Sequence, residues 1–230
     1  MRAPISIIIP TLNCAETLPA TLGALGEGLA AGLIRELIVS DGGSLDATVT
    51  IAEAAGATLV SGSPGRGPQL RRGASAAAAD WLLFVHADTW LLPGWAAAVA
   101  KHLEQHSAPA CFRLRFRASG SAARLVAGWA NLRTRLFSLP YGDQALLVRR
   151  DAYENAGGYQ DIALMEDVAL VRALPRVRML PATAETDAGT YLHEGWLRRG
   201  ALNLTLLLRF FLGADPNKLA RSYQRKRPHR

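Results

Sequence analysis

Continuous apolar runs alternate with amphipathic stretches over the first 90 residues of the chain. The runs cover Ile5–Ile9, Arg35–Val39 and Trp81–Val85, and a shorter one covers Ala57–Ser61. Runs without polar alternation are typical of strands that are buried on both faces of a parallel sheet. The segments between the early runs carry apolar residues at helical spacing. The pattern therefore predicts a β-α-β-α-β order with right-handed crossovers.

Helices are expected between these strands and in the second half of the chain. The expected helices are Ala15–Ala31, Asp46–Ala55, Gln69–Ala79, Pro93–Lys101, Ala122–Phe137, a short one from Asp151 and another from Met165. Two further strands are expected, at Cys111–Arg117 and Ala145–Val148. The first of these alternates apolar and basic residues, which predicts one exposed face. The second half should therefore be mixed in strand direction and pack beside the parallel half.

These elements predict an α/β fold with a mostly parallel, Rossmann-like central sheet flanked by helices and followed by C-terminal helices. We expect residues 1–190 to form one domain, in which 1–90 is the parallel half and 91–190 is the half of mixed strand direction. Residues 191–230 are expected to form a helical extension that ends in a basic tail, Arg221–Arg230.

Composition narrows the class of partner. Of the 230 residues 50% are hydrophobic, and the formal net charge is +7. A positive chain suits a polyanionic ligand or an anionic membrane surface. Its basic residues are scattered and form no recognisable nucleic-acid-binding module, so nucleic acid is not an expected partner.

Cysteine usage and the absence of leader-like patterns bear on the compartment. Cys14 and Cys111 lie far apart, which favours two free thiols in a reducing cytoplasm. Met1–Pro4 leads directly into a strand and predicts no signal peptide. The apolar run Leu202–Leu212 is too short to span a bilayer. We therefore expect a cytoplasmic protein, with the inner face of the membrane as the alternative.

Acidic residues follow two of the predicted strands. Asp41 opens the turn Asp41-Gly42-Gly43-Ser44, and Asp88 closes His86-Ala87-Asp88. Because parallel strands present their carboxyl ends at one edge of a sheet, both acids should reach the same cleft. Carboxylates there can hold a nucleotide and ligate a divalent metal. Asp46 stands in the first turn of a helix, where capping is an equally good interpretation.

A second acidic pair, Glu166-Asp167, follows the apolar residues Ala163-Leu164-Met165. A carboxylate presented from a partly apolar loop is suited to general-base chemistry on a hydroxyl. Capping of the following helix is the alternative interpretation.

Six motifs follow one another along the chain: Ile7–Asn13, Ser40–Thr48, Gly65–Leu70, Phe84–Thr89, Tyr141–Gln144 and Leu164–Val168. In this order they resemble the motifs of the family 2 inverting glycosyltransferases of GT-A fold, and the resemblance covers nearly the whole chain. The chain is most similar to a small bacterial subgroup described as transferase 2, radical-SAM/selenodomain-associated. The resemblance implies that residues 1–190 are a catalytic domain, with 1–90 as a nucleotide-binding half and 91–190 as an acceptor half.

The resemblance implies transfer of a sugar from a nucleotide-diphosphate sugar, a UDP-sugar by default, to the hydroxyl of an unknown acceptor with inversion. It implies that Asp167 is the catalytic base, with Glu166 beside it, and that Asp88 ligates Mg²⁺ or Mn²⁺. The implied nucleotide-binding residues are Pro10, Thr11, Asn13, Asp41, Gly42, Gly43, Ser44, Asp46, Arg66, Gln69, His86 and Ala87. The implied acceptor-binding residues are Tyr141, Gly142, Asp143 and Gln144.

The chain departs from the family pattern at two places. The metal motif has one acid, Asp88, and the segment after Glu185 lacks the paired arginines of the relatives. His193, Arg198 or Arg199 would have to replace them. The alternatives are a degenerate, non-catalytic nucleotide-sugar binder and a sugar nucleotidyltransferase, although the latter usually has a glycine-rich basic loop after its first strand. An oxidoreductase is disfavoured because no G-x-G-x-x-G follows that strand.

The sequence leaves the roles of two peripheral segments open between two interpretations each. The arginines of Phe112–Arg117 either form a rim around a phosphorylated acceptor or are simply solvated. Leu197–Leu212 is apolar on almost all sides and is followed by the basic tail. It is either an interfacial membrane anchor or a helix packed on the catalytic domain or at a homodimer interface.

Overall fold

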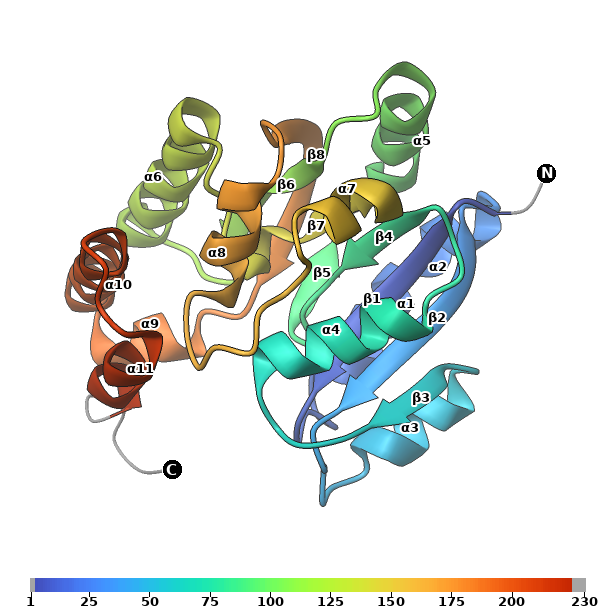
Figure 1. Cartoon of the computed structure of the whole chain (residues 1–230), viewed down its shortest axis with the longest axis horizontal. Coiled ribbons are helices and arrows are strands. Elements are labelled where there is room, and N and C mark those ends of the chain that lie inside the picture. Colours follow the sequence, from blue (N-terminus) through green and yellow to red (C-terminus); the bar gives the residue numbers. More distant parts are fainter. Residues whose placement is uncertain (1–2, 225–230) are drawn as a thin grey trace.

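The computed structural model describes residues 3–224, so most of the predicted basic tail lies outside the described residues. One eight-stranded sheet runs through the molecule in the order β3-β2-β1-β4-β7-β6-β8-β5, with helices on both faces (Figure 1). The strands are β1 (Ile5–Thr11), β2 (Ile34–Asp41), β3 (Thr58–Ser61), β4 (Trp81–Phe84), β5 (Thr89–Leu91), β6 (Ala110–Phe116), β7 (Leu146–Arg149) and β8 (Arg178–Thr186).

Two strands, β7 and β5, run opposite to the other six in this order. Strands β3, β2, β1 and β4 are parallel, which agrees with the predicted first half. Strand β7 runs antiparallel to both β4 and β6, whereas β8 pairs parallel with β6 and antiparallel with β5. The carboxyl ends of the parallel strands therefore lie at one edge of the sheet, next to segments from the second half of the chain.

The helices connect these strands or follow them. They are α1 (Leu18–Ala24), α2 (Gly26–Ala30), α3 (Thr48–Ala54), α4 (Arg66–Ala76), α5 (Trp95–Gln105), α6 (Ser121–Phe137), α7 (Arg150–Asn155), α8 (Glu166–Ala173), α9 (Gly189–Glu194), α10 (Trp196–Phe211) and α11 (Pro216–Gln224), with a 3-10 turn at Gly142–Gln144. No helix of the described chain is long and apolar enough to cross a membrane.

Each face of the sheet has its own apolar core. On one face, Ile7 and Ile9 of β1 pack with Leu18 and Trp95 from α1 and α5. On the other face, Ile8 packs with α4, α7 and α8. The alternation along β1 follows from the period of two in a strand, and each fully buried aliphatic side chain contributes about 1.5–3 kcal/mol. The continuous apolar run thus serves two cores at once.

The structure corrects two expected helices and adds two strands. The single helix expected over Ala15–Ala31 is two, because the chain turns at Leu25 and brings Gly28 against Trp95. A Cβ on Gly28 would lie 2.3 Å from the Trp95 ring. Helix α4 begins at Arg66, three residues before the expected start, so the arginine of the predicted loop lies in its first turn. Strand β8 and the short β5 were not expected at all.

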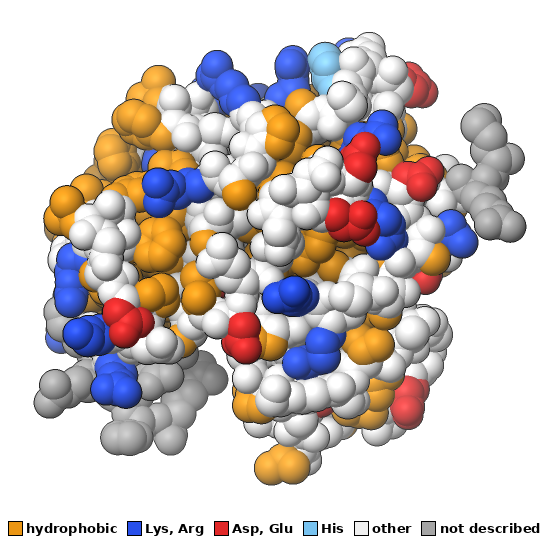
Figure 2. Space-filling view, viewed as in Figure 1, with side chains coloured by type: hydrophobic (Ala, Val, Ile, Leu, Met, Phe, Trp, Pro, Cys, Tyr) orange, Lys and Arg blue, Asp and Glu red, His pale blue; other side chains and the backbone are white. Residues whose placement is uncertain are grey.

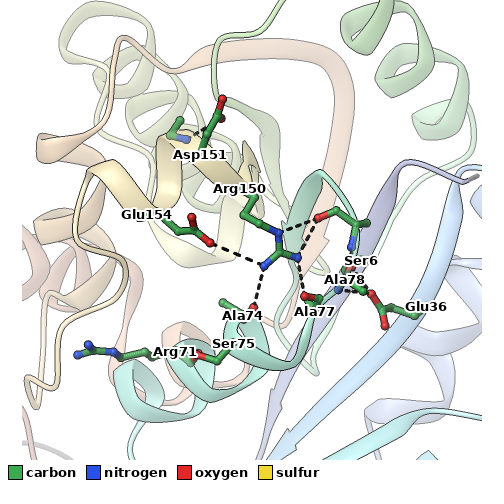
Figure 3. Close-up of polar contacts among 12 residues, drawn as sticks. Ser6, Glu36, Arg71, Ala74, Ser75, Ala77, Ala78, Arg150, Asp151 and Glu154 are labelled. Carbon is green, nitrogen blue, oxygen red and sulfur yellow. Dashed lines mark hydrogen bonds and ion pairs between the residues drawn. The ribbon is translucent and has the colours of Figure 1, made fainter.

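Arg150 ties the two halves of the sheet together (Figure 3). Its guanidinium donates to the carbonyl oxygens of Ala77 at 2.6 Å and Ala79 at 2.9 Å, at the end of α4. A longer contact reaches the carbonyl of Ala74 at 3.5 Å. The end of a helix leaves carbonyls without intrahelical donors, and this arginine satisfies them.

The C-terminal helices pack on the start of α8. Met165 and Val168 form an apolar cluster with Leu206 and Leu207 of α10 and Leu219 of α11. In Figure 1 these helices lie beside α8, at the end of the sheet away from β3. The segment that carries Glu166 and Asp167 is therefore fixed by residues near the end of the chain.

Candidate active site

A cavity of about 190 Å³ opens where the carboxyl end of β4 faces the start of α8. It brings together residues from four of the six sequence motifs and from the C-terminal helices. Its lining includes Arg66, His86, Asp88, Tyr141, Gly142, Asp143, Glu166, Asp167, Thr186, Asp187, Tyr191, Arg199, Asn203 and Tyr223. Asp88 and Asp167, predicted as metal ligand and base, thus share one hollow.

Asp167 is held by two backbone donors. Its Oδ2 accepts a hydrogen bond from the N–H of Gly142 at 2.8 Å, and its Oδ1 accepts one from Val168 at 2.7 Å. Its carboxylate is half-buried, and further lone pairs stay available to a hydroxyl donor. The acid is fixed in orientation and still reachable from the cavity.

Glu166 lies deeper than Asp167 and is paired with a cation. Only 3% of Glu166 is exposed, and its Oε1 lies 3.6 Å from Nη1 of Arg66. Burial raises the pKa of the Glu166 carboxyl to about 6, and the charge of Asp167 adds to the rise while Arg66 opposes it. Glu166 therefore anchors Arg66 at the cavity wall.

The turn before α8 is unusual in its backbone. Met165 has φ 69° and ψ 22°, a left-handed conformation that non-glycine residues seldom adopt. Its side chain is buried in the cluster with α10 and α11, which offsets the strain. The C-terminal helices thereby aim the acid pair into the cavity.

Asp143 faces the same cavity as an unpaired acid. Its Oδ1 is buried and has no hydrogen-bond partner. Burial raises the pKa of Asp143 to about 6, and the charges of Asp167 and Asp88 add to this while Arg133 opposes it. The Arg133 guanidinium lies 3.6 Å above the ring of Tyr141 and donates from Nε to the carbonyl of Leu139. Arg133 thus supports the whole Tyr141–Gln144 turn from behind.

His86 lies opposite this turn and stays uncharged. Burial, together with the charge of Arg66, lowers the pKa of His86 to about 3. A Cβ on Gly142 would come within 2.5 Å of the His86 Nε2, so the turn requires glycine here. A neutral imidazole can accept a hydrogen bond from a ligand at one ring nitrogen.

The carboxylates of this cavity suit a hard divalent cation. Asp88 and Asp187 line it together with Asp143, whose buried oxygen lacks a partner. Oxygen ligands of this kind are those that Mg²⁺ and Mn²⁺ prefer. Among the described residues, no group of three His, Cys, Asp or Glu side chains is close enough to hold a metal by itself. The donor set therefore fits a metal whose remaining ligands come from a bound diphosphate or from water.

Asp41 does not line this cavity, so the prediction that Asp41 and Asp88 reach the same cleft is wrong. The Asp41 carboxylate is only 2% exposed and accepts four hydrogen bonds. Two come from the N–H groups of Gly43 and Ser44 at 2.7 and 2.8 Å, and two from the hydroxyls of Ser44 and Thr11 at 2.6 and 3.0 Å. These bonds lower the pKa of Asp41 even though burial opposes them. The acid shapes the turn after β2.

The predicted nucleotide residues of the loops after β1 and β2 gather around that turn, whereas Arg66 and His86 line the cavity and Ala87 packs in the apolar core. Asn13 accepts from the N–H of Leu45 at 2.8 Å, and Asp46 accepts from the N–H of Ala15 at 3.0 Å. These bonds lock the loop after β1 to the loop after β2, with Pro10, Gly42 and Gly43 between them. The two loops form a rigid platform at the carboxyl edge of the sheet, separate from the residues that line the cavity.

Two glutamines predicted as ligand contacts are buried and hydrogen bonded within the protein. Gln69 donates to the carbonyls of Thr11 at 2.6 Å and Ser40 at 2.9 Å, so its amide joins the ends of β1 and β2. Gln144 is fully buried, accepts from the hydroxyl of Thr134 and donates to the carbonyl of Phe112. Both amide groups thus hold backbone next to the site, and direct contact of Gln69 and Gln144 with a ligand stays a prediction.

The sequence prediction missed several residues near or in the cavity. Arg117 donates to the carbonyl of Asp88 at 2.7 Å and to that of Glu185 at 3.0 Å, and it covers the ring of Trp90 at 3.9 Å. The sequence predicts Arg117 only as part of a basic rim or as a solvated residue, and does not place it against Asp88. The C-terminal residues Tyr191 and Asn203, joined by a 3.0 Å hydrogen bond, gave no local signal because only tertiary packing brings them here.

One of the three candidates for the missing arginine pair reaches the cavity. Arg199 lines it, whereas His193 and Arg198 are exposed and do not. The Arg199 guanidinium is already paired with the buried Glu194 at 3.1 Å and covers the ring of Tyr223 at 4.2 Å. Its charge is thus largely satisfied within the protein.

A second, larger hollow of about 980 Å³ lies between β6 and α6. Arg113, Arg115 and Arg124 line it, and the acid in its wall, Glu185, is paired with Arg115 at 2.7 Å. It lacks the convergent carboxylates of the first cavity, so it is a basic groove rather than the catalytic centre.

Comparison with known proteins agrees with this geometry. The family model described as glycosyl transferase family 2 matches residues 6–167. The chain therefore belongs to glycosyl transferase family 2, and the predicted family and GT-A fold are confirmed. The matched segment ends at Asp167, so the C-terminal helices lie beyond it.

Curated relatives match over part of their length. The chain is 38% identical to glucosyl-3-phosphoglycerate synthase of Mycolicibacterium smegmatis over 93 residues, which is 36% of this chain and 30% of that protein. It is 37% identical to a PGL/p-HBAD biosynthesis glycosyltransferase of Mycobacterium tuberculosis over 115 residues, 46% of this chain and 44% of that one. The chain thus spans less than half the length of these relatives.

Solved structures share the fold. Glucosyl-3-phosphoglycerate synthase from Mycobacterium tuberculosis, in complex with Mg²⁺ and UDP, aligns with a TM-score of 0.56 at 22% identity, over 80% of this chain and 69% of that one. TarS of S. aureus aligns with a TM-score of 0.61 at 16% identity, over 86% of this chain and 39% of that one.

Proposed function

We propose that this protein transfers a sugar from a UDP-sugar to an acceptor hydroxyl with inversion, and that Asp167 is the general base. The observation that carries the proposal is the shared cavity of Asp88 and Asp167, with Asp167 oriented by the N–H of Gly142 at 2.8 Å. Within the family, we assign the chain to the radical-SAM/selenodomain-associated transferase 2 subgroup on its motifs.

Asp167 is a better base than its neighbour Glu166. Glu166 is almost fully buried and paired with Arg66, whereas Asp167 is half-buried and lines the cavity. An inverting transfer is a single displacement, so the base must approach the acceptor on the face of the sugar away from the diphosphate. Asp167 would take the proton of the acceptor hydroxyl as its oxygen attacks the anomeric carbon.

The donor would extend from the loop platform into the cavity. The cavity of about 190 Å³ is smaller than the roughly 300–1,000 Å³ of typical ligand sites, so it suits the sugar and diphosphate rather than the whole nucleotide. The nucleoside would lie on the platform around Asn13, Ser44 and Asp46. The choice of uridine rests on the solved synthase structures that hold UDP or UDP-glucose.

Asp88 and Asp143 are the residues that would hold Mg²⁺ or Mn²⁺. Such an ion, when bound, neutralises the leaving diphosphate. Arg66 stands at the same wall and would add a positive charge beside the phosphates, while neutral His86 would accept a hydrogen bond. Tyr141, Asp143 and the 191–224 extension would border the acceptor, which makes this extension part of the acceptor half.

A non-catalytic nucleotide-sugar binder is the second candidate. This candidate is favoured because the Arg199 guanidinium is paired with Glu194. Arg199 therefore does not supply the positive charge of the missing arginine pair. Catalytic turnover separates the two. Thermal-shift measurements with nucleoside diphosphates and their sugars, with and without Mn²⁺, identify the donor. Release of UDP in the presence of that donor and Mn²⁺ supports a transferase, whereas binding without turnover in the presence of candidate acceptors supports the binder.

A further inference from the structure

Exposed apolar side chains gather on two neighbouring helices. Nine of the fourteen exposed large apolar side chains among the described residues lie on α6 and α10, which pack against each other. Solvent-exposed apolar residues are normally scattered singly, so this concentration marks an interaction surface. The members, here called the apolar face, are Leu125, Trp129, Leu132, Leu136, Phe137, Leu197, Leu204, Leu208 and Phe211.

The apolar face is a continuous stripe on each helix. On α6 the spacing of Leu125, Trp129, Leu132 and Leu136 repeats every three or four residues, which places them on one side. The opposite side of α6 is buried against β6. Figure 2 shows the hydrophobic side chains over α6 and α10 on the left of the molecule, with Lys and Arg side chains among them.

The charged residues on the two helices of the apolar face have one sign. Neither α6, with 17 residues, nor α10, with 16, contains an aspartate or glutamate. Arg124 and Arg135 of α6 and Arg198 and Arg209 of α10 are exposed. Next to α6 lies the basic groove, where Arg113 also has no acidic partner within the described part of the chain.

We propose that α6 and α10 dock this protein onto an anionic lipid surface, with the apolar face in the acyl boundary and the arginines at the headgroups. Helices with an apolar face, a tryptophan and surrounding arginines bind membranes in this way. A second copy of the chain fits less well, because a self-complementary contact would bring arginines together without acids to pair with them. The basic groove offers guanidinium groups to the lipid phosphates.

The surface and the cavity share one helix. Asn203 and Leu206 of α10 line the cavity, whereas Leu204 and Leu208 point outward. Docking would therefore hold the cavity about one helix diameter from the lipid. The proposal does not depend on the transfer reaction, since lipid binding can be measured without any donor.

The test is sedimentation of the full chain with vesicles. We expect wild type to bind phosphatidylglycerol/phosphatidylcholine vesicles and to bind pure phosphatidylcholine vesicles much more weakly, because exposed arginines respond to surface charge. Leu136→Glu and Leu208→Glu should each lower the partition coefficient about tenfold or more. Leu29→Glu, which places the same change on an equally exposed leucine of α2, should leave it unchanged. All variants keep the basic tail, so any contribution of the tail to vesicle binding is the same in wild type and in each variant.

Three results would overturn the proposal. The first is that wild type fails to bind anionic vesicles. The second is that Leu136→Glu, Leu208→Glu and Leu29→Glu all bind as wild type does, which would assign any binding to the tail. The third is that light scattering shows a dimer which Leu136→Glu converts to monomer, which would assign the apolar face to a second copy. Circular dichroism of each variant establishes that it is folded.

Discussion

The backbone N–H of Gly142 donates to Oδ2 of Asp167 at 2.8 Å, so a turn in the middle of the chain orients the acid at the start of α8. The same glycine lies against His86, where a Cβ would come within 2.5 Å of the ring. One residue therefore fixes the base and the neutral histidine relative to each other.

Gly142→Ala is expected to displace this turn and to disturb the orientation of Asp167. Because small misplacements of reacting groups cost large factors in rate, we predict a fall in kcat of about 10- to 100-fold with little change in UDP affinity. Steady-state kinetics and isothermal titration measure both. Gly128→Ala on α6 is the matched control, since a Cβ there meets nothing within 4 Å. Equal turnover in the two variants would contradict the role given to Gly142.

Asp143→Asn should stabilise the fold in a pH-dependent manner. The pKa of Asp143 is raised to about 6, so its contribution to stability is fully present below its ordinary pKa near 4 and is lost as the pH rises through 6. Asparagine stays neutral at every pH. The free energy of unfolding of the variant, relative to that of wild type, should therefore rise by about 1–2 kcal/mol as the pH increases from 4.5 to 7.5. Urea unfolding at several pH values measures this gain.

The control for Asp143 is the exposed Asp161, where Asp161→Asn should shift the free energy of unfolding by less than about 0.5 kcal/mol at any pH. A stability difference between Asp143→Asn and wild type that does not vary with pH would show that burial does not perturb this carboxyl.

Arg150→Gln is predicted to lower the free energy of unfolding by about 2–3 kcal/mol. It removes the donors to the buried carbonyls of Ala77 and Ala79 at the end of α4 (Figure 3) and leaves these acceptors without partners, whereas the Ala74 carbonyl keeps the N–H of Ala77. The neighbouring Arg149→Gln breaks only an exposed pair with Asp151 and should cost less than about 1 kcal/mol. Urea unfolding of both variants checks this, and similar losses would refute it.

The buried pair of Arg199 and Glu194 should be strongly coupled. Glu194→Gln leaves a buried guanidinium without its counter-charge and is expected to cost about 3 kcal/mol. Replacing both residues by apolar ones, in Glu194→Leu/Arg199→Met, should recover much of this loss. A double-mutant cycle by urea unfolding measures the coupling. Additive losses would mean that the two side chains act independently.

The fold was predictable where the sequence pattern is local. The run Ile5–Ile9 can only be a strand buried on both faces, and β1 is one. Strand β8 was missed because Pro181 and the alternation of small and polar residues hide it. Its register with β6 shifts between Cys111 and Arg113, at the level of this proline. A proline cannot donate to the ladder, and pairing of this kind is decided by neighbours far along the chain.

The candidate site was predictable in part for a similar reason. Parallel topology alone brings the end of β4 to the edge of the sheet where Asp88 lies. The orientation of the Asp41 carboxylate depends instead on donors from Thr11 and Ser44, and hydrogen bonds between two loops leave no periodic signal. The contribution of Tyr191 and Asn203 to the cavity depends on how α10 packs against α8, which the pattern of α10 does not determine.

Turnover of Asp167→Asn tests the central claim most directly. With the donor found by thermal shift, Mn²⁺ and an acceptor, the variant should bind UDP within about threefold of wild type and lose about 10²–10⁴-fold in kcat, the usual contribution of a general base. Turnover equal to wild type, with UDP binding intact, would contradict the assignment of Asp167 as the base.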